Sequence, residues 1–379
     1  MSKVESKPAA SYALSLISGE ARGPVAAALR AALALLAVLY RIGLAAFLLP
    51  YRLGIRKRRR LPRPVISIGN MTFGGTGKTP AVRTIAAGLQ ARGLRPVILS
   101  RGHGGRRHGS PTIVSDGAKR RLSAAESGDE PAMLADLLPG VPVVVGKNRW
   151  RSGQLAIREF DPDVILLDDA LQYWQLHRDV DVVLINAVEP FGYGRLMPRG
   201  ALREPLAGLK RADVVVITNS DRATSDGLAG IKRRIAGIAP DSLIVEAVHK
   251  PVGLRFVSGE TVGIDWLRGR QVCSACSIGA PGLFANSLAA MGAEVVLEFN
   301  FPDHHLWSGD EIETIAVRAA EVGAEAILTT EKDAVKLPAG ELRLPVLAVD
   351  VMMDFGEADV ISAVMEKARV IPSPLTAEG

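Results

Sequence analysis

The sequence is poor in cysteine, in aromatic residues and in long hydrophobic runs. Only two of its 379 residues are cysteine, which excludes a disulfide-rich secreted scaffold and favours a reducing cytoplasm. Aromatic residues make up 5%, whereas 48% hydrophobic and 23% charged residues are close to the globular average and exclude a mainly disordered chain. The length is enough for about two to three domains of roughly 150 residues each.

The one strongly apolar segment, residues 24–51, is interrupted by charge. Its longest stretch without a charged residue is ten residues, whereas a helix needs about twenty to span a bilayer. Arg30, Arg41 and Arg52 recur every eleven residues, so one face of a helix would carry all three. We therefore expect a membrane-associated helix that lies in the interface, with a domain-packing helix and a membrane-spanning helix as the alternatives.

Positive charge is concentrated in the same N-terminal region. The formal net charge is +6, yet residues 1–63 contain twelve Lys and Arg against two Glu. The run 52–63 alone holds seven basic residues and no acidic one. Each basic residue is worth about 1 kcal/mol beside an anionic lipid surface. The uneven charge indicates an anionic membrane surface as a partner and argues against nucleic acid, because the folded body carries no excess of positive charge.

From residue 64 onward, short β-branched runs alternate with helical stretches. This pattern predicts an α/β fold with a largely parallel sheet and flanking helices. The predicted strands are 64–68, 96–99, 141–145, 164–167, 180–185, 214–218, 243–248, 272–277, 295–299, 326–329 and 346–349. We expect four regions: a membrane-associated helix with a basic linker at 1–63, a P-loop NTPase-like core at 64–240, a smaller α/β domain at 241–372 and a tail at 373–379.

The strongest single motif is ISIGNMTFGGTGKTP at residues 66–80. A β-run leads into a glycine-rich loop and an amphipathic helix follows, which is the context of a P-loop. Backbone N–H groups at the helix start would hold nucleotide phosphates, with Lys78 on the β- and γ-phosphates and the Thr79 hydroxyl on Mg²⁺. The strict pattern has glycine at position 72, so the motif is a variant. The expected nucleotide-binding residues are Thr72, Phe73, Gly74, Gly75, Thr76, Gly77, Lys78 and Thr79.

Three further motifs supply acidic or histidine side chains. ILLDDALQ ends a hydrophobic strand in Asp168 and Asp169, the usual form of a Walker B element, which would help to hold Mg²⁺. In SGDEPAMLA, Asp129 precedes a helix and taken alone is best explained as its N-cap. In FPDHH, His304 is a candidate general base if a carboxylate lies beside it.

The two cysteines, Cys273 and Cys276, are spaced as C-x-x-C on a predicted strand. A structural zinc site needs a second pair of ligands, and none accompanies them. We therefore expect two small core residues.

Taken together and in order, eight motifs resemble the tetraacyldisaccharide 4′-kinase family, the kinases of lipid A biosynthesis. They are VISIGNMTFGGTGKTP, LSRG, SGDEPAMLA, LLDDALQ, LHRDVDVVLI, GRLMPRGALREPL, FPDHH and TTEKDAVKL. The resemblance runs from about Leu36 to Val349. It implies a membrane-associated P-loop kinase at the cytoplasmic face of the inner membrane, which uses ATP and Mg²⁺. Its reaction would transfer the γ-phosphoryl group of ATP to the 4′-hydroxyl of tetraacyldisaccharide 1-phosphate to give lipid IVA.

The resemblance also implies roles for individual residues. Asp129 would accept the proton of the sugar hydroxyl while His304 orients or tunes it, which replaces the N-cap interpretation. Lys78 and Arg203 would stabilise the transferring charge. The implied metal ligands are Thr79, Asp168, Asp169 and Glu204. The implied substrate-binding residues are Asn70 and Arg149.

The chain departs from the family pattern beside two of these motifs. Ala170, Leu171 and Tyr173 replace the glycine, phenylalanine and histidine that commonly follow the aspartate pair, and His103 replaces a tyrosine. These changes leave open the roles of positions 103 and 173. Two other classes of function also remain. A GTPase switch would need N-K-x-D, which ITNSD at 217–221 does not match, and a nucleotide-binding scaffold would lack catalysis.

Overall fold

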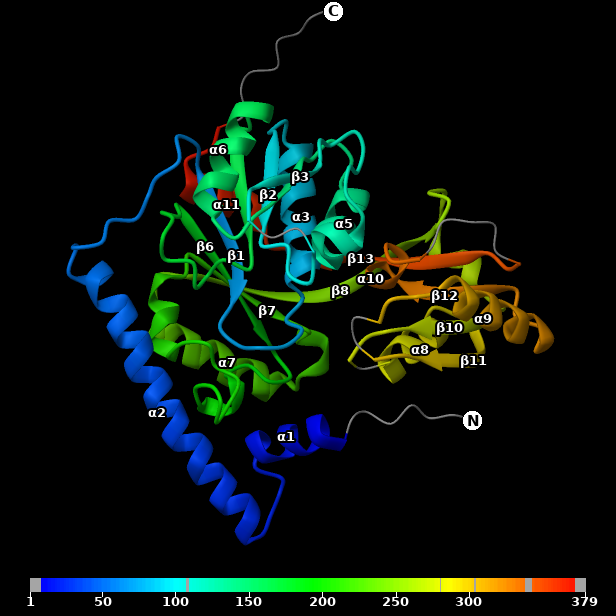
Figure 1. Cartoon of the computed structure of the whole chain (residues 1–379), viewed down its shortest axis with the longest axis horizontal. Coiled ribbons are helices and arrows are strands. Elements are labelled where there is room, and N and C mark those ends of the chain that lie inside the picture. Colours follow the sequence, from blue (N-terminus) through cyan, green and yellow to red (C-terminus); the bar gives the residue numbers. More distant parts are fainter. Residues whose placement is uncertain (1–7, 107–108, 280, 303–304, 338–342, 372–379) are drawn as a thin grey trace, which may run out of the picture.

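The computed structural model describes residues 8–106, 109–279, 281–302, 305–337 and 343–371 (Figure 1). The described strands are β1 (Val65–Asn70), β2 (Pro96–Ser100), β3 (Thr112–Ser115), β4 (Val143–Val145), β5 (Val164–Asp168), β6 (Val180–Asn186), β7 (Val214–Thr218), β8 (Leu243–Phe256), β9 (Thr261–Val262), β10 (Gln271–Cys276), β11 (Glu294–Asn300), β12 (Ala326–Thr330) and β13 (Val346–Asp354). The helices are α1 (Pro8–Ser18), α2 (Pro24–Arg52), α3 (Lys78–Ala91), α4 (Ala124–Ser127), α5 (Asp129–Leu137), α6 (Arg149–Phe160), α7 (Ser225–Ile238), α8 (Pro281–Ala290), α9 (Gly309–Glu321), α10 (Glu331–Ala334) and α11 (Val360–Ala368).

The strands form one continuous sheet, and the predicted α/β fold class is confirmed. The order is β11-β10-β12-β13-β8-β7-β6-β1-β5-β2-β4-β3, with β9 paired to β8. Around β1, the neighbouring strands in the order β4-β2-β5-β1-β6-β7 all pair in parallel. The edge strand β3 pairs antiparallel with β4. All residues of β1, β5 and β7 are buried, because helices cover both faces of a parallel sheet.

Alternate residues of each strand supply the two faces of the core. Ile66 and Ile68 of β1 belong to the cluster that contains α3, α5 and α11, whereas Val65 belongs to the cluster that contains α6. Helix α7 covers β6 and β7 on the α6 side. Because β1 is a central strand of the parallel part, the loop that follows it lies at the carboxyl edge of the sheet, where α/β folds bind ligands.

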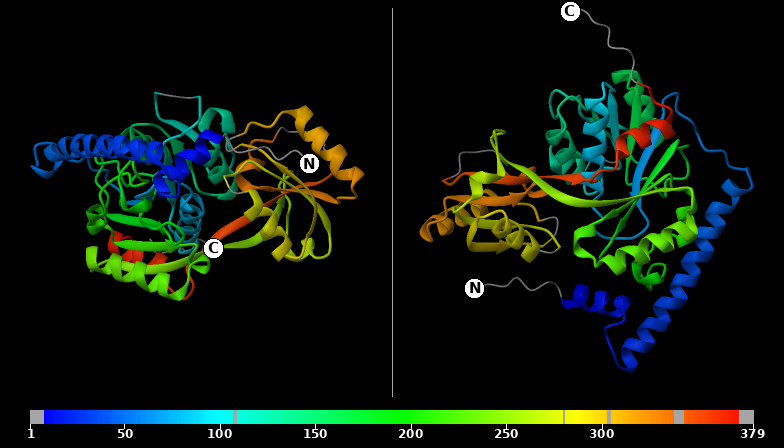
Figure 2. Two further views of the ribbon diagram at one scale, coloured as in Figure 1. Left: turned by 90° about the horizontal axis from the view of Figure 1, so that it is seen from below. Right: turned by 180° about the vertical axis from the view of Figure 1, so that it is seen from behind.

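The long strands β8 and β13 join the two parts of the sheet (Figures 1 and 2). β8 first pairs in parallel with β7 and then, from Val248 onward, antiparallel with β13. The sequence predicts strands that end at 248 and 349, but both strands continue to Phe256 and Asp354. The extension was missed because it spans the gap between two cores and lacks a continuous buried face. Its Pro251 lies at a register shift in the ladder, where a strand tolerates proline.

Beyond this connection, β10, β11 and β12 continue in parallel from β13, with α8 and α9 in separate core clusters on them. The chain then returns, and α11 packs against α3, β1 and β6. The last helix of the segment 241–372 therefore contributes to the core of residues 64–240.

The N-terminal arm consists of the short helix α1 and the long helix α2, which are in contact and lie at one side of the molecule (Figure 1). The sequence did not predict α1, and α2 continues through Pro50 to Arg52. α2 is the one helix in the described part of the chain that is long and apolar enough to cross a membrane, judged by length and composition alone. Only 6% of its most apolar window is buried. The following linker lies against the body, with Arg58 over the Trp174 ring and Arg59 over the Trp150 ring.

Candidate active site

The P-loop lies between β1 and α3, and two features require glycine there. Gly77 is the N-cap of α3 and has a left-handed φ of 78°. A Cβ at this position would stand 2.5 Å from Nε2 of His249, so the loop and β8 are in direct contact. A Cβ on Gly74 or Gly75 would meet nothing within 4 Å. The loop therefore leaves open space beside the N-terminus of α3, which is suited to phosphate oxygens.

Asn70, at the end of β1, holds two cationic side chains together. Its Oδ1 lies 3.4 Å from Nζ of Lys78 and 3.3 Å from Nη1 of Arg203. Its Nδ2 donates to the carbonyl of Thr72 at 2.7 Å, which fixes the orientation of the amide. Arg203 also pairs with Asp169 at 2.7 Å. The structure thus brings Lys78, Arg203 and Asp169 around one asparagine at the entrance to the P-loop.

Asp168, at the end of β5, is a buried carboxylate with one unused oxygen. Oδ2 accepts a hydrogen bond from Ser100 at 2.9 Å, whereas Oδ1 is buried without a hydrogen-bond partner. Burial raises the pKa of Asp168 from 3.8 to about 7, and the carboxylates of Glu130 and Asp169 add to this effect. A divalent cation would supply both the missing partner and the compensating charge, so this residue fits Mg²⁺.

Mg²⁺ commonly uses one or two carboxylates and completes its shell with waters and phosphate oxygens. The described residues contain no group of three or more His, Cys, Asp or Glu arranged to hold a metal. Asp168 with the Thr79 hydroxyl therefore suits a metal that is shared with a bound nucleotide.

Glu204 is buried and both of its oxygens are engaged. Arg211 donates to Oε1 and Oε2 at 2.6 and 2.8 Å, and Gln172 donates to Oε1 at 2.8 Å. Gln172 also donates to the carbonyl of Asn70 at 3.0 Å. In this structure Glu204 anchors the loop that carries Arg203, and its role as a metal ligand stays a prediction.

Arg149 is buried beneath the aspartate pair. It donates to the carbonyl of Gly146 at 2.8 Å and to that of Asp168 at 3.4 Å, and burial lowers the pKa of its guanidinium group. The Tyr173 hydroxyl accepts the backbone N–H of Arg149 at 3.1 Å. Position 173, whose role the sequence left open, therefore supports the start of α6. A substrate-binding role for Arg149 stays a prediction.

Asp129 is the first residue of α5 and not its N-cap, because the N-cap position falls on Gly128. Gly128 has a φ of 96°, and a Cβ there would stand 2.4 Å from the carbonyl oxygen of His103. Asp129 is half-buried. The adjacent Glu130 acts electrostatically on Asp168, so the start of α5 faces the Walker B strand. The proposed partner His304 lies outside the described residues.

The cysteines are buried free thiols, as expected for core residues. Burial raises the pKa of each thiol to about 12, which suppresses the reactive thiolate.

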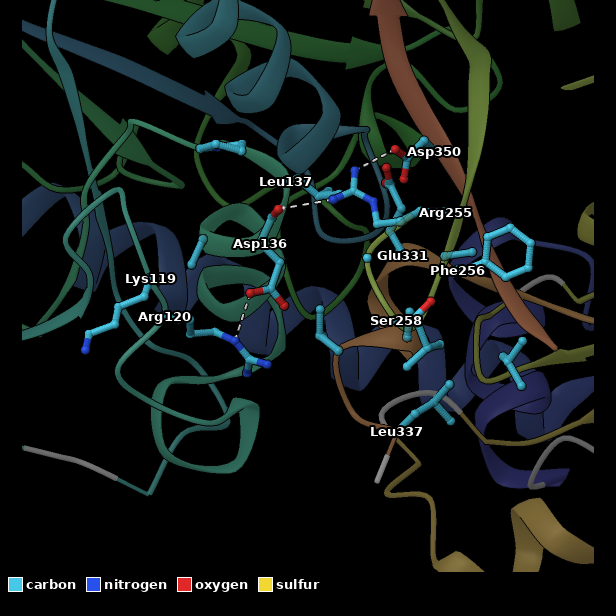
Figure 3. A pocket seen from close by; sticks show the side chains of 18 of the residues that line it. Lys119, Arg120, Asp136, Leu137, Arg255, Phe256, Ser258, Glu331, Leu337 and Asp350 are labelled. Carbon is cyan, nitrogen blue, oxygen red and sulfur yellow. Dashed lines mark hydrogen bonds and ion pairs between the residues drawn. The ribbon is translucent and has the colours of Figure 1, made fainter. Parts of the chain in front are cut away.

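A cavity of about 830 Å³ lies at the other end of α5 (Figure 3). Asp136 pairs there with Arg120 at 2.9 Å, and Arg255 bridges the carbonyl of Asp136 and the carboxylate of Asp350. No residue of the P-loop or of the Walker B strand lines this cavity. It is therefore distinct from the nucleotide site.

The comparison with protein families decides the assignment. The model of the tetraacyldisaccharide-1-P 4′-kinase family matches residues 29–369. The chain belongs to this family. A tetraacyldisaccharide 4′-kinase from Anaeromyxobacter sp. (strain K) is 42% identical over 331 residues, covering 86% of this chain and 87% of the relative. Another from Geobacter sulfurreducens is 40% identical over 363 residues, covering 96% of each chain.

A solved structure also resembles this chain over most of its length. LpxK from Aquifex aeolicus, in the "apo" form in complex with ATP, aligns with a TM-score of 0.75 and 31% sequence identity. The alignment covers 90% of this chain and 99% of the Aquifex chain. The chain with this P-loop motif therefore belongs to a kinase family of which one solved structural relative is in complex with ATP.

Sequence reasoning missed several residues that complete the site. Gln172 and Arg211 hold Glu204. Oδ1 of Asn219, a hydrogen-bond acceptor, lies 2.9 Å from Nδ1 of His249, the residue in contact with the P-loop. The Tyr40 hydroxyl donates to the carbonyl of Arg203 at 2.6 Å. Gln172 directly follows the recognised aspartate motif and could have been included. The other contacts join segments far apart in the sequence and carried no local signal.

Proposed function

We propose that this chain transfers the γ-phosphoryl group of ATP to the 4′-hydroxyl of tetraacyldisaccharide 1-phosphate, giving lipid IVA. The observation that carries the proposal is the unpartnered buried oxygen of Asp168 beside an open P-loop, in a chain that matches this kinase family over residues 29–369. Phosphoryl transfer depends mainly on positioning and charge stabilisation, which this set of side chains supplies.

Mg-ATP supplies the phosphoryl group, and the metal neutralises part of its charge. The backbone N–H groups of the P-loop hold the phosphates, and the ammonium of Lys78 adds a positive charge beside them. Arg203 is held by Asn70 and Asp169 close to Lys78 and stabilises the charge that develops on the phosphoryl oxygens. Asp168 and Thr79 would hold the metal.

Asp129 acts as the general base in this proposal. Asp129 is the first residue of α5 and is followed by Glu130, whose charge raises the pKa of Asp168. The start of α5 is therefore close to the Walker B carboxylate. Asp129 accepts the proton of the 4′-hydroxyl as the oxygen attacks phosphorus. His304 orients or tunes this carboxylate. Closure of the smaller part of the chain, which carries β10, β11 and β12, over the core at 64–240 brings the two together and excludes water.

The N-terminal arm, residues 1–63, holds the protein at a membrane surface. α2 exposes large apolar side chains along most of its length, at Val25, Leu29, Leu35, Leu36, Val38, Leu39, Ile42, Phe47 and Leu49. An acylated substrate stays in the bilayer, so a surface-bound enzyme meets it by two-dimensional diffusion. We assign the protein to the cytoplasmic face of the inner membrane, where its basic linker meets anionic lipid.

The test is transfer of labelled γ-phosphate to tetraacyldisaccharide 1-phosphate in mixed micelles, with ATP and GTP compared. We expect transfer from ATP that falls at least about a hundredfold in Lys78→Ala and Asp129→Ala. Asp116→Ala, which removes a carboxylate whose hydrogen-bond partners are Ala118, Lys119 and Arg121, should keep full activity. Failure of folded, nucleotide-binding protein to label the lipid would overturn the proposal, and preference for GTP would favour a switch.

A further inference from the structure

Tyr40 connects the exposed helix α2 to the candidate active site. Its hydroxyl donates to the carbonyl oxygen of Arg203 at 2.6 Å, across 163 residues of sequence. Among the described residues, this is the one side-chain hydrogen bond from α2 to the body beyond residue 60. α2 is largely exposed, and Tyr40 lies on its half-buried face, so the hydrogen bond is a specific polar attachment within that face.

The carbonyl that Tyr40 binds belongs to a segment that is paired with the approach to the P-loop. The N–H of Arg203 donates to the carbonyl of Met71 at 2.7 Å, and the N–H of Phe73 donates to the carbonyl of Ala201 at 2.8 Å. The Arg203 main chain is thus held on one side by residues that lead into the P-loop. Tyr40 holds it on the other side.

The side chain of Arg203 depends on this main-chain position. Its guanidinium group reaches Asp169 at 2.7 Å and Asn70 at 3.3 Å, and it lies 5.4 Å from the centre of the Phe73 ring. A side chain that must meet a developing charge tolerates little displacement of its backbone, because a shift of about 1 Å can cost a hundredfold in rate.

We propose that Tyr40 is a positioning residue for Arg203, which ties the charge-stabilising arginine to the helix that faces the lipid. The inference rests on the role proposed above for Arg203. The apolar residues Leu36, Leu39 and Ile42 lie within one helical turn of Tyr40 and are exposed. The hydrogen bond of Tyr40 therefore connects the helix that contacts the lipid surface with the main chain of Arg203.

Removal of one hydroxyl group tests the inference, and the same helix offers a matched control. The hydroxyl of Tyr51 is buried without a hydrogen-bond partner, so Tyr51→Phe removes the same group without breaking a bond. We expect Tyr40→Phe to lower kcat about fivefold, the effect of one neutral hydrogen bond. The KM for the lipid and co-sedimentation with phosphatidylglycerol vesicles should stay within about twofold, since neither depends on Arg203. Tyr51→Phe should match the natural protein.

A double-variant cycle separates positioning from general support of the fold. In an Arg203→Lys background, which keeps a charge but loses the guanidinium geometry, Tyr40→Phe should cause little further loss of kcat. An additive loss would overturn the inference, as would an unchanged kcat or a loss confined to the lipid KM and vesicle binding. If the natural protein transferred no phosphate to the lipid, the proposed function itself would fail.

Discussion

At the residue scale, Asp168 is a buried carboxylate whose burial disfavours its charged form and so lowers the stability of the folded chain at neutral pH and above. Its pKa lies at about 7 in the folded protein against 3.8 for the ordinary side chain, mainly because of burial. The folded state therefore keeps a proton that the unfolded chain releases. Its stabilising contribution is present below about pH 4 and is lost as the pH rises through 7.

Replacement of this carboxylate should separate stability from activity. We expect Asp168→Asn to raise the midpoint of thermal unfolding by a few degrees at pH 8 without Mg²⁺, and to change it little at pH 4. Kinase activity should fall at least about a hundredfold, because the amide is a poor replacement for a metal-binding carboxylate. Calorimetry at the two pH values measures the first effect, with the surface variant Asp265→Asn as control. A lower midpoint at pH 8 would contradict this account of Asp168.

At the scale of elements, α3 is tied to the connecting strand β13 by a buried ionic cluster. Arg83 of α3 pairs with Glu331 of α10 and lies 3.5 Å from Asp350 of β13. It also donates to the carbonyl of Val351 at 3.2 Å. Burial raises the pKa of Glu331 to about 7 although Arg83 opposes the shift. The cluster links the helix that follows the P-loop to the strands that carry the smaller part of the chain.

Breaking this cluster should destabilise the protein in a pH-dependent way. Arg83→Met leaves the buried carboxylate of Glu331 without its paired cation, while Asp350 keeps its ion pair with Arg255, so we expect a loss of about 3 kcal/mol in the free energy of unfolding at pH 8. The loss should be smaller at pH 6, where Glu331 is mostly protonated and the arginine compensates less charge. Urea denaturation measures both values. Arg268→Met, which breaks an exposed ion pair with Asp265, is the control and should change little at either pH.

The role proposed for α2 at a lipid surface also belongs to this scale. We expect Leu39→Gln with Ile42→Gln to weaken binding to phosphatidylglycerol vesicles at least about tenfold, because both exposed side chains would lose apolar contact with the bilayer. Sedimentation with vesicles gives the affinity. The same changes at Val252 and Val257, which are exposed on and just after β8, should have no effect. Equal binding of the two double variants would remove α2 from the membrane contact.

For the whole molecule, the sequence was informative wherever chemistry and periodicity are local. The alternating runs predicted the α/β fold, and each of the eleven predicted strands overlaps a strand of the structure. The P-loop and the aspartate pair were recognised because glycine, lysine and paired carboxylates follow buried strands at short spacing. The lengths of β8 and β13 and the return of α11 were missed, because they depend on how two cores are joined and not on a local pattern.

The polar contacts that complete the candidate site could not be predicted from the sequence either. The sequence around Tyr40 indicates only an amphipathic helix, and the sequence around His249 indicates only a strand. Their contacts with Arg203 and Gly77 arise only when segments far apart in the sequence meet. The motifs of the candidate site could thus be found in the sequence, whereas the side chains that contact them required the structure.

If the P-loop, Asp168 and Arg203 serve transfer of a phosphoryl group to a lipid sugar, the lipid itself must carry the product. Phosphorus NMR and mass spectrometry of the lipid recovered after incubation with Mg-ATP identify this product. We expect one added phosphoryl group on the 4′-hydroxyl with the 1-phosphate intact, and no such product from Lys78→Ala. Recovery of unchanged lipid from folded protein that binds ATP, with inorganic phosphate as the only product, would contradict it.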